Sequence, residues 1–298
     1  MSQIVRDYMS IQRVAVVTGS SSGIGFETSL ALARNGFHTF ATMRNLEEDS
    51  KHIMDVATKE NLPLQAMQLD VNNEKSVADA IDRIAKEKGH IDVVVNNAGY
   101  DLDGAIEEIS IDEMRAMFDT NCFGAVEVMK AVIPMMRNQR SGKIVNITSM
   151  GGRIAIPFHS IYHGTKFALE GMSESIQYEL EPFGVKIILI EPGAVRSNFW
   201  KNMKTAEKPS GSGPESTTDL GYSQMKIKIS ESLKQVAQSG LHPSEVAKAI
   251  LEAVTSNNPD FRYAVGKDAA MTIEARKNMS DREFGNSIKK QFNLQNIG

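Results

Sequence analysis

Short apolar runs, often of β-branched residues, recur along the chain, and most are followed by a stretch in which apolar residues return every three or four positions. Continuous or alternating apolar runs of about four to eight residues are typical of strands, whereas the longer spacing is typical of helices with one buried face. The runs predict strands at Val14–Val17, His38–Met43, Leu64–Leu69, Asp92–Asn96, Ile144–Thr148, Val185–Ile190 and Phe261–Val265.

Helical spacing fills the gaps between several of these runs. The predicted helices cover Ile24–Asn35, Glu74–Lys88, Ile111–Arg137 and about Ser160–Leu180. Ser110 and Glu113 have the spacing of a capping box, which places the start of the third helix. Pro134 lies inside this helix, and we expect it to kink the helix or end it early, because proline lacks the N–H group that a helix interior needs.

Strands that alternate with helices predict an α/β fold with a doubly wound parallel sheet, because right-handed crossovers place helices over both faces. One composition change stands out at Thr205–Ser223, which is rich in Ser, Gly, Pro and Thr and predicts an irregular, mobile loop. We interpret residues 1–298 as a single domain with a substrate-loop insertion around 199–240. The polar C-terminal tail, residues 267–298, has a helical pattern and no assigned role.

Composition narrows the possible functions. The 298 residues are 41% hydrophobic and 23% charged, as in ordinary globular proteins. A net charge of −4 with no basic run argues against nucleic acid as a partner. No apolar stretch approaches the ~20 residues of a membrane helix, and the first residues lack the apolar core of a signal peptide. The single cysteine, Cys122, excludes internal disulfides and suits a reducing compartment, so we expect a cytoplasmic protein without stable membrane insertion.

A glycine-rich turn joins the first predicted strand to the first predicted helix. Its sequence is Thr18-Gly19-Ser20-Ser21-Ser22-Gly23-Ile24-Gly25. Glycines permit a tight turn and close backbone approach, and the free N–H groups of a helix start attract a pyrophosphate. The position therefore predicts a Rossmann-type dinucleotide site, with Gly19, Ser21, Ser22, Gly23, Ile24 and Gly25 as cofactor-binding residues.

Three further side chains are predicted to meet at the same edge of the sheet. Tyr162 and Lys166 are four residues apart on a predicted helix, and Ser149 follows the fifth strand. Carbonyl reduction needs a hydride and a proton. Tyrosine, with a pKa of about 10, needs a nearby ammonium to stabilise its phenolate. We therefore predict Tyr162 as the general acid/base, Lys166 as its electrostatic partner and Ser149 as the group that holds the substrate oxygen.

The motifs resemble the short-chain dehydrogenase/reductase family. The glycines are spaced G-x-x-x-G-x-G, Asn96-Asn97-Ala98-Gly99 follows the fourth strand, and the Ser, Tyr and Lys residues keep the family order over roughly Arg13–Phe199. Pro157-Phe158 and the segment from Tyr162 to Gly171 are most similar to the hydroxysteroid and retinol dehydrogenase branch. The resemblance implies a homodimer or homotetramer.

The resemblance also implies roles for residues beyond the glycine turn. It places Asp70 and Val71 near the adenine ring, and Asn121 in the catalytic set, where it helps to hold a water chain behind Lys166. It implies that Pro192 and Gly193 cover the nicotinamide amide. The cofactor-binding residues that it adds are Asp70, Val71, Asn97, Ala98, Gly99, Tyr162, Lys166, Pro192, Gly193, Val195 and Ser197.

The end of the second predicted strand bears on which nicotinamide cofactor is bound. In dinucleotide-binding folds an acidic residue about twenty positions after the glycines binds the ribose 2′-hydroxyl, whereas an arginine accommodates a 2′-phosphate. This chain has Arg44 there and no acid before Glu47. NADP(H) is therefore the predicted cofactor, with Ser22 as an added contact and NAD(H) as the weaker alternative.

The predicted function is a hydride transfer between NADP(H) and a carbonyl or secondary alcohol, on a lipophilic ketone or alcohol. Met203, Leu220, Tyr222 and Met225 are candidates for an apolar pocket mouth. Two alternatives stay open: a non-catalytic NADP(H)-binding sensor or scaffold, and a 3-oxoacyl carrier-protein reductase. A metal site is not expected, because His159 and His163 lack the glutamate of H-E-x-x-H. A serine hydrolase is not expected either, because the chain has no G-x-S-x-G.

Replacement of Arg44 tests the cofactor assignment. We expect Arg44→Asp to invert the ratio of kcat/KM for NADPH and NADH, because a carboxylate repels the 2′-phosphate and accepts a hydrogen bond from a 2′-hydroxyl. Steady-state kinetics with both cofactors measure the ratio. An unchanged ratio would show that Arg44 does not distinguish the 2′-phosphate from the 2′-hydroxyl of the ribose.

Overall fold

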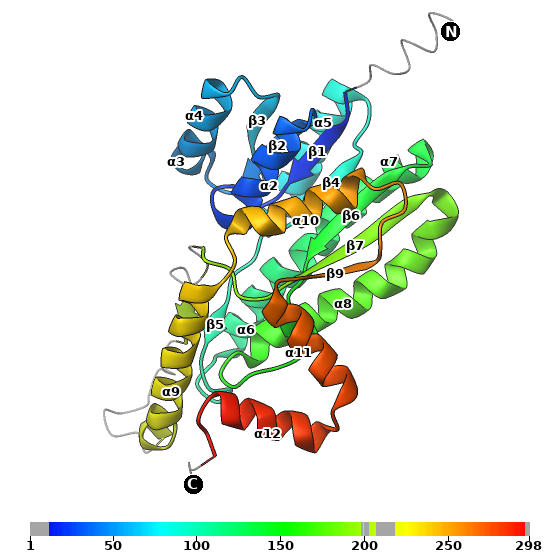
Figure 1. Ribbon diagram of the computed structural model, residues 1–298. Coiled ribbons are helices and arrows are strands. Elements are labelled where there is room, and N and C mark those ends of the chain that lie inside the picture. Colours follow the sequence, from blue (N-terminus) through cyan, green and yellow to red (C-terminus); the bar gives the residue numbers. More distant parts are fainter. Residues whose placement is uncertain (1–11, 198, 200–202, 207–217, 296–298) are drawn as a thin grey trace, which may run out of the picture.

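The computed structural model describes residues 12–197, 199, 203–206 and 218–295, and within them a seven-stranded parallel sheet forms the centre of the molecule (Figure 1). From edge to edge its strands are β3 (Leu64–Gln68), β2 (His38–Met43), β1 (Val14–Val17), β4 (Val93–Asn96), β6 (Gly142–Ile147), β7 (Val185–Pro192) and β9 (Arg262–Val265).

The strand order reverses beside β1. The chain adds β2 and β3 on one side of β1, and then crosses to β4 and adds β6, β7 and β9 on the other. The predicted doubly wound, Rossmann-type α/β sheet is thereby confirmed. Since all pairs are parallel, the segments that follow β1, β4, β6 and β7 leave the sheet at one edge, where such folds bind ligands.

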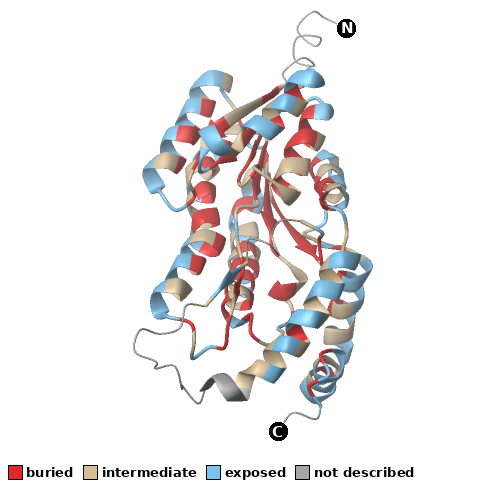
Figure 2. Ribbon diagram, turned by 90° about the vertical axis from the view of Figure 1, so that its left-hand side faces the viewer, coloured by how far each residue is buried: buried red, intermediate tan, exposed pale blue. Residues whose placement is uncertain are grey.

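Helices cover both faces of the sheet, and alternate side chains of each strand face opposite layers. Val14 and Val16 of β1 belong to the core on one face, and Ala15 and Val17 to the core on the other. The first core includes α5 (Glu74–Lys88), α7 (Gly124–Gln139) and the end of α8 (Ser160–Leu180), and the second α2 (Gly23–Arg34) and α10 (Pro243–Thr255). Figure 2 shows these buried residues between the layers.

The predicted long helix is interrupted by a wider turn. It consists of α6 (Ile111–Phe118), a π-helical turn at Asp119–Phe123 and then α7. The predicted capping box of Ser110 and Glu113 is present. Pro134 does not end the helix, which continues to Gln139. The π turn matters for the site because it carries Asn121.

Two short helices that the apolar pattern did not predict cover the outer strands. They are α3 (Leu46–Asp49) and α4 (Lys51–Lys59). Ile53 and Ala57 of α4 are buried with residues of α2, β2 and β3. No helix within the described part of the chain is long and apolar enough to cross a membrane.

The segment after β7 holds more regular structure than its composition predicts. A two-residue strand, β8 (Lys204–Thr205), pairs with β5 (Leu102–Asp103), and α9 (Thr218–Ser239) begins inside the predicted loop. The predicted irregular segment Thr205–Ser223 is therefore shorter than expected at both ends. Residues 207–217, and the side chain of Leu220, lie outside the described part of the chain.

The C-terminal residues pack against α9. After β9 the chain forms α11 (Lys267–Asn278) and α12 (Asp281–Gln291), and Phe292 and Leu294 then enter a buried cluster with Phe158 and Ile229. Tyr222 and Met225 of α9 belong to this cluster as well. The prediction that these two line the pocket mouth is wrong: they join α9 to the tail, because the end of the chain returns to cover their helix face.

Candidate active site

One cavity of about 430 Å³ follows the carboxyl edge of the sheet. It joins the glycine turn after β1 to the segments that follow β4, β6 and β7. The predicted residues that line it are Gly19, Ser21, Ser22, Gly23, Ile24, Arg44, Asp70, Val71, Asn97, Ala98, Gly99, Ser149, Tyr162, Lys166, Pro192, Gly193, Val195 and Ser197. Gly25 and Asn121 do not line the cavity. Gly25 lets the glycine turn pack closely, and Asn121 holds the segment after β4 in place.

The glycine turn needs glycine for two different reasons. Gly19 and Gly23 have φ values of +66° and +59°, in the left-handed region that other residues rarely adopt. At Gly25 a Cβ atom would collide with the carbonyl oxygen of Gly19 and with the side-chain nitrogen Nδ2 of Asn97. The turn therefore folds tightly over the start of α2, and this leaves room for a pyrophosphate beside the helix N-terminus.

Asn97 ties the end of β4 to the glycine turn. Its Nδ2 donates to the carbonyl oxygens of Thr18 at 2.9 Å and Gly19 at 3.0 Å. In return, Thr18 Oγ1 accepts the backbone N–H groups of Asn97 at 3.0 Å and Ala98 at 3.1 Å. The two segments form one rigid wall of the cavity.

Ser149, Tyr162 and Lys166 meet where the cavity passes the end of β6. Ser149 hydrogen-bonds Tyr162 through its side chain, and its Oγ accepts the N–H of Gly151 at 2.9 Å. Lys166 Nζ lies 5.7 Å from the centroid of the Tyr162 ring and donates to the carbonyl oxygen of Ile147 at 2.9 Å. The structure thus brings the predicted trio together, with the lysine held behind the phenol.

Burial dominates the ionisation of this trio. It raises the pKa of Tyr162, an effect that the charge of Asp101 reinforces and the Ser149 hydrogen bond opposes. Burial also lowers the pKa of Lys166 to about 8, against the opposing charges of Asp101 and Glu170. Near neutral pH the phenol of Tyr162 is therefore protonated, and the pKa of Lys166 lies only slightly above the pH of the solution.

Asn121 lies on the π turn and is 1% exposed. Its Oδ1 accepts the N–H of Tyr100 at 2.9 Å, and its Nδ2 donates to the carbonyl oxygen of Tyr100 at 2.7 Å and to Thr165 Oγ1 at 3.3 Å. The side chain thus joins the segment after β4 to α8. π turns often occur at functional sites. Its role in a water chain behind Lys166 stays a prediction.

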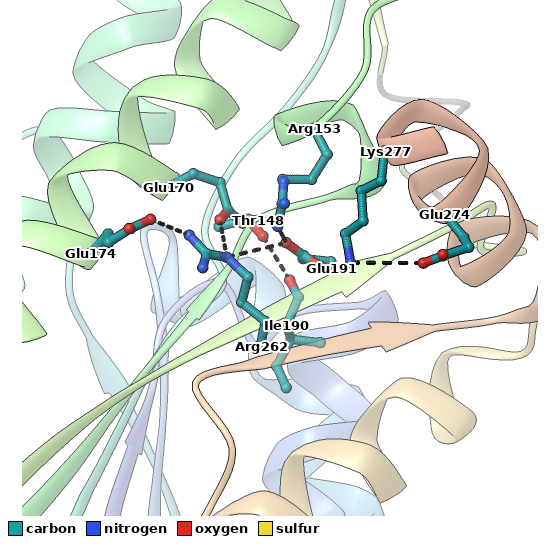
Figure 3. Close-up of polar contacts among 9 residues, drawn as sticks. All are labelled: Thr148, Arg153, Glu170, Glu174, Ile190, Glu191, Arg262, Glu274 and Lys277. Atoms are coloured by element: carbon teal, nitrogen blue, oxygen red, sulfur yellow. Dashed lines mark hydrogen bonds and ion pairs between the residues drawn. The ribbon is translucent and has the colours of Figure 1, made fainter. Parts of the chain in front are cut away.

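A buried ionic cluster lies beyond Lys166, one helical turn along α8 (Figure 3). Arg262 of β9 pairs with Glu170 at 3.0 Å and Glu191 at 3.6 Å, and Arg153 pairs with Glu191 at 2.9 Å. The carboxylate side chains are only 6% and 3% exposed. Burial raises the pKa of Glu170, and its hydrogen bonds with Thr148 and Arg262 oppose this shift. The cluster ties α8, β7 and β9 together behind the site.

The structure adds residues around the cavity that the motifs did not reveal. Asp268 of α11 accepts the N–H of Ala194 at 2.7 Å and so holds the Pro192–Gly193 segment from the far end of the chain. Apolar side chains end the cavity beyond Tyr162: Ile154, Ile156, Phe199, Leu233 and Val236. No local pattern marks these residues. Acidic residues are common in the first turn of a helix, so the sequence gives no sign that Asp268 contacts the Pro192–Gly193 segment.

Asp101 and His159 also line the cavity, as a buried pair that the sequence did not show. His163 has a structural role, because its Nδ1 lies 2.8 Å from the carbonyl oxygen of Gly151 and its Nε2 accepts the N–H of Ile156 at 3.0 Å. Among the described residues, no three His, Cys, Asp or Glu side chains gather as metal ligands.

Replacement of Arg262 tests how much this cation stabilises the folded protein. We expect Arg262→Met to lower the free energy of unfolding by about 3 kcal/mol near neutral pH, because Glu170 and Glu191 stay buried without their shared cation. Without Arg262 the folded-state pKa of Glu170 rises further above its unfolded value. The loss should therefore be small in acid and grow as the pH rises through the folded-state pKa.

Urea unfolding at about pH 5 and about pH 8 measures this loss. Arg115→Met is the control, since Arg115 and its partner Asp112 are 72% and 91% exposed and should contribute less than about 0.5 kcal/mol. A loss of equal size at both pH values would contradict the electrostatic account.

Comparison with known proteins identifies the family. The short chain dehydrogenase family matches residues 13–208. Retinol dehydrogenase 8 of Homo sapiens is 38% identical over 84% of this chain and 80% of its own length. A crystal structure of a short-chain dehydrogenase from Streptomyces avermitilis is 30% identical, with a TM-score of 0.79 over 96% of this chain and 99% of that one.

An alcohol dehydrogenase from Thermococcus sibiricus, solved in complex with 5-hydroxy-NADP, is 25% identical, with a TM-score of 0.68 over 85% of this chain and 95% of that one. The glycine turn and the Ser149, Tyr162 and Lys166 trio all lie within the matched residues 13–208. The chain is therefore an oxidoreductase of the short-chain dehydrogenase/reductase family, similar to retinol dehydrogenase 8.

Proposed function

We propose that this oxidoreductase uses NADPH to reduce the ketone of a lipophilic substrate, with Tyr162 as the general acid. The observation that carries the proposal is the continuity of one cavity. The cavity runs from the glycine turn and Arg44, past Ser149, Tyr162 and Lys166, to an apolar end.

The trio suits proton delivery to a carbonyl oxygen. When bound, the nicotinamide cofactor supplies the hydride. Ser149 Oγ holds the carbonyl oxygen beside the phenol, and Tyr162 donates its proton to that oxygen as it gains negative charge. The ammonium of Lys166 then stabilises the phenolate that remains. The raised pKa of Tyr162 favours the protonated form that the reductive direction requires.

Arg44 supports the choice of NADP(H). It follows β2, is exposed, and lines the end of the cavity next to the glycine turn. A guanidinium in this place suits a 2′-phosphate, whose oxygens it can bind through two parallel hydrogen bonds. The Thermococcus enzyme in complex with 5-hydroxy-NADP shows that a related fold accepts this class of cofactor.

The apolar end of the cavity supports a lipophilic substrate. Ile154 and Ile156 come from the segment before α8, and Leu233 and Val236 from α9. Burial of hydrocarbon against such a wall contributes about 25 cal/mol for each Å². The similarity to retinol dehydrogenase 8 agrees with a substrate of this kind.

Exposed aromatic residues support assembly with a second copy of the chain. Phe167 and Tyr178 are 46% and 63% exposed and lie eleven residues apart on α8, which places them on one face. Phe123, on the neighbouring π turn, is 53% exposed. We propose a homodimer or homotetramer through this face, located in the cytoplasm, where the lone and buried Cys122 needs no disulfide partner.

Tyr162→Phe tests the proposed activity. We expect the wild-type protein to oxidise NADPH in the presence of lipophilic ketones and the variant to lose at least about a hundredfold in kcat, because the Tyr162 hydroxyl delivers the proton to the carbonyl oxygen. The decrease of nicotinamide absorbance measures turnover, and NADPH fluorescence confirms that the variant still binds the cofactor. Tight NADPH binding without turnover across a panel of aliphatic, aromatic, steroid, retinoid and acyl-thioester carbonyls would favour a sensor.

Lys166 should set the alkaline limb of the pH profile. Since burial lowers its pKa to about 8, the lysine loses its charge above that pH, and we expect kcat/KM for ketone reduction to fall there. Lys166→Arg keeps a positive charge at every pH in this range and should move the fall to higher pH, at a lower maximal rate. Identical profiles for the two proteins would assign the limb to another group.

A further inference from the structure

A buried Asp–His pair lies at the substrate end of the cavity, apart from the trio. His159 Nδ1 is 2.8 Å from Asp101 Oδ2, and the two side chains are 3% and 5% exposed. Asp101 Oδ1 also accepts the N–H of Leu102 at 2.7 Å. The carboxylate is therefore held by its own backbone, and it holds the imidazole in one orientation with Nδ1 as the donor.

The second ring nitrogen of His159 is unused by the described protein. Nε2 is buried and has no hydrogen-bond partner among the described residues. His163, one turn further along α8, uses both of its ring nitrogens. A buried donor or acceptor without a hydrogen bond destabilises the folded state, so an unpaired Nε2 calls for a partner. Since both His159 and Asp101 line the cavity, a bound molecule is the natural partner for Nε2.

The place of His159 limits where that partner lies. His159 is the N-cap residue of α8, three residues before Tyr162, and three residues correspond to a rise of about 4.5 Å along a helix. Because both side chains line the one cavity, we infer that the carbons one or two bonds from a carbonyl held by Tyr162 lie next to the imidazole. The polar group that meets Nε2 belongs on one of those carbons.

The charge around His159 limits the chemistry of the partner. Three titratable groups interact with the ring: Asp101, Asp103 and His163. Burial acts to lower the pKa of His159, but the hydrogen bond and charge of Asp101 outweigh it and the pKa is raised. The charged ring donates through Nε2, and the neutral ring with its Nδ1 proton on the Asp101 side accepts there. A hydroxyl group pairs with either form, because it donates and accepts.

We propose that His159, oriented by Asp101, hydrogen-bonds a substrate hydroxyl on a carbon one or two bonds from the reacting carbonyl. The preferred substrate is then a lipophilic hydroxy ketone rather than a plain ketone. This inference rests on the proposed ketone reductase function and names its substrate class. His159 is a substrate-binding residue in this scheme, and Asp101 is a positioning residue.

Matched ketones test the proposal with the full-length protein and NADPH. The substrates are 2-undecanone, 1-hydroxy-2-undecanone and 4-hydroxy-2-undecanone, which share chain length and differ only in the hydroxyl. We expect the wild type to favour at least one hydroxy ketone by about tenfold or more in kcat/KM, since a site built for a hydroxyl discriminates against the analogue that lacks it. Equal values for all three substrates would overturn the proposal.

Variants locate the preference. His159→Phe keeps a ring but removes Nε2, and should abolish the preference by lowering kcat/KM for the hydroxy ketones more than kcat/KM for 2-undecanone. His159→Gln keeps a polar group and should retain part of the preference, and Asp101→Asn should weaken it. Asp103→Asn is the matched control, because it removes a neighbouring charge without touching the Nδ1 hydrogen bond, and its preference should be that of the wild type.

The selectivity ratio does not depend on how much of a variant is folded, so a destabilised His159→Phe protein still gives a valid answer. An equal loss on all three ketones would show that His159 is only structural and would overturn the inference. Absence of NADPH oxidation with every ketone would instead overturn the proposed function.

Ligand binding then tests the hydroxyl contact independently of turnover. With NADP⁺ present, 1,2-undecanediol or 2,4-undecanediol should raise the Tm of the wild type more than 2-undecanol does, and His159→Phe should lose this difference. Equal shifts for the diols and the alcohol in the wild type would overturn the inference by this second route.

Discussion

The parallel pairing of β1, β4, β6 and β7 is the constraint on which the rest of the structure depends. It sends the chain out of the sheet at one edge four times, so that the glycine turn, the Asn97 segment, Ser149 and the Pro192–Gly193 segment all reach a single cavity. Asn97 fixes two of these segments to each other, because its side-chain amide donates to the carbonyl oxygens of Thr18 and Gly19 in the glycine turn.

Charge is concentrated where the sheet edge is most buried. Lys166 lies behind Tyr162, and Glu170 follows one turn further along α8. Arg262 pairs with Glu170 and with Glu191 of β7, and Arg153 pairs with Glu191 (Figure 3). Each buried charge alone would be strongly unfavourable, and each is acceptable here because an opposite charge or a backbone carbonyl lies within hydrogen-bonding distance. The same cluster fixes β9 against α8, which keeps the lysine in place.

The substrate end is assembled from parts of the chain that are far apart. The end of the chain packs on α9 through Phe292 and Leu294, and α9 in turn supplies Leu233 and Val236 to the cavity. Asp101 comes from the loop after β4 and His159 from the start of α8. The cofactor end is built from local turns, whereas the substrate end depends on tertiary contacts, which lets its lining vary while the sheet stays the same.

The sequence by itself determined the sheet, all seven of its strands and the positions of the glycine turn and the trio, because these depend on local periodicity and on which residues follow a strand. It did not reveal α3, α4 or α10, or the interruption of the long helix, where the apolar spacing runs on through the π turn. Only the tertiary structure decided that Asp101 meets His159 over 58 positions, Asp268 meets Ala194 over 74 and Arg262 meets Glu170 over 92. Such pairs leave no periodic trace in the chain, since their stability comes from charge and desolvation at points that only folding brings together.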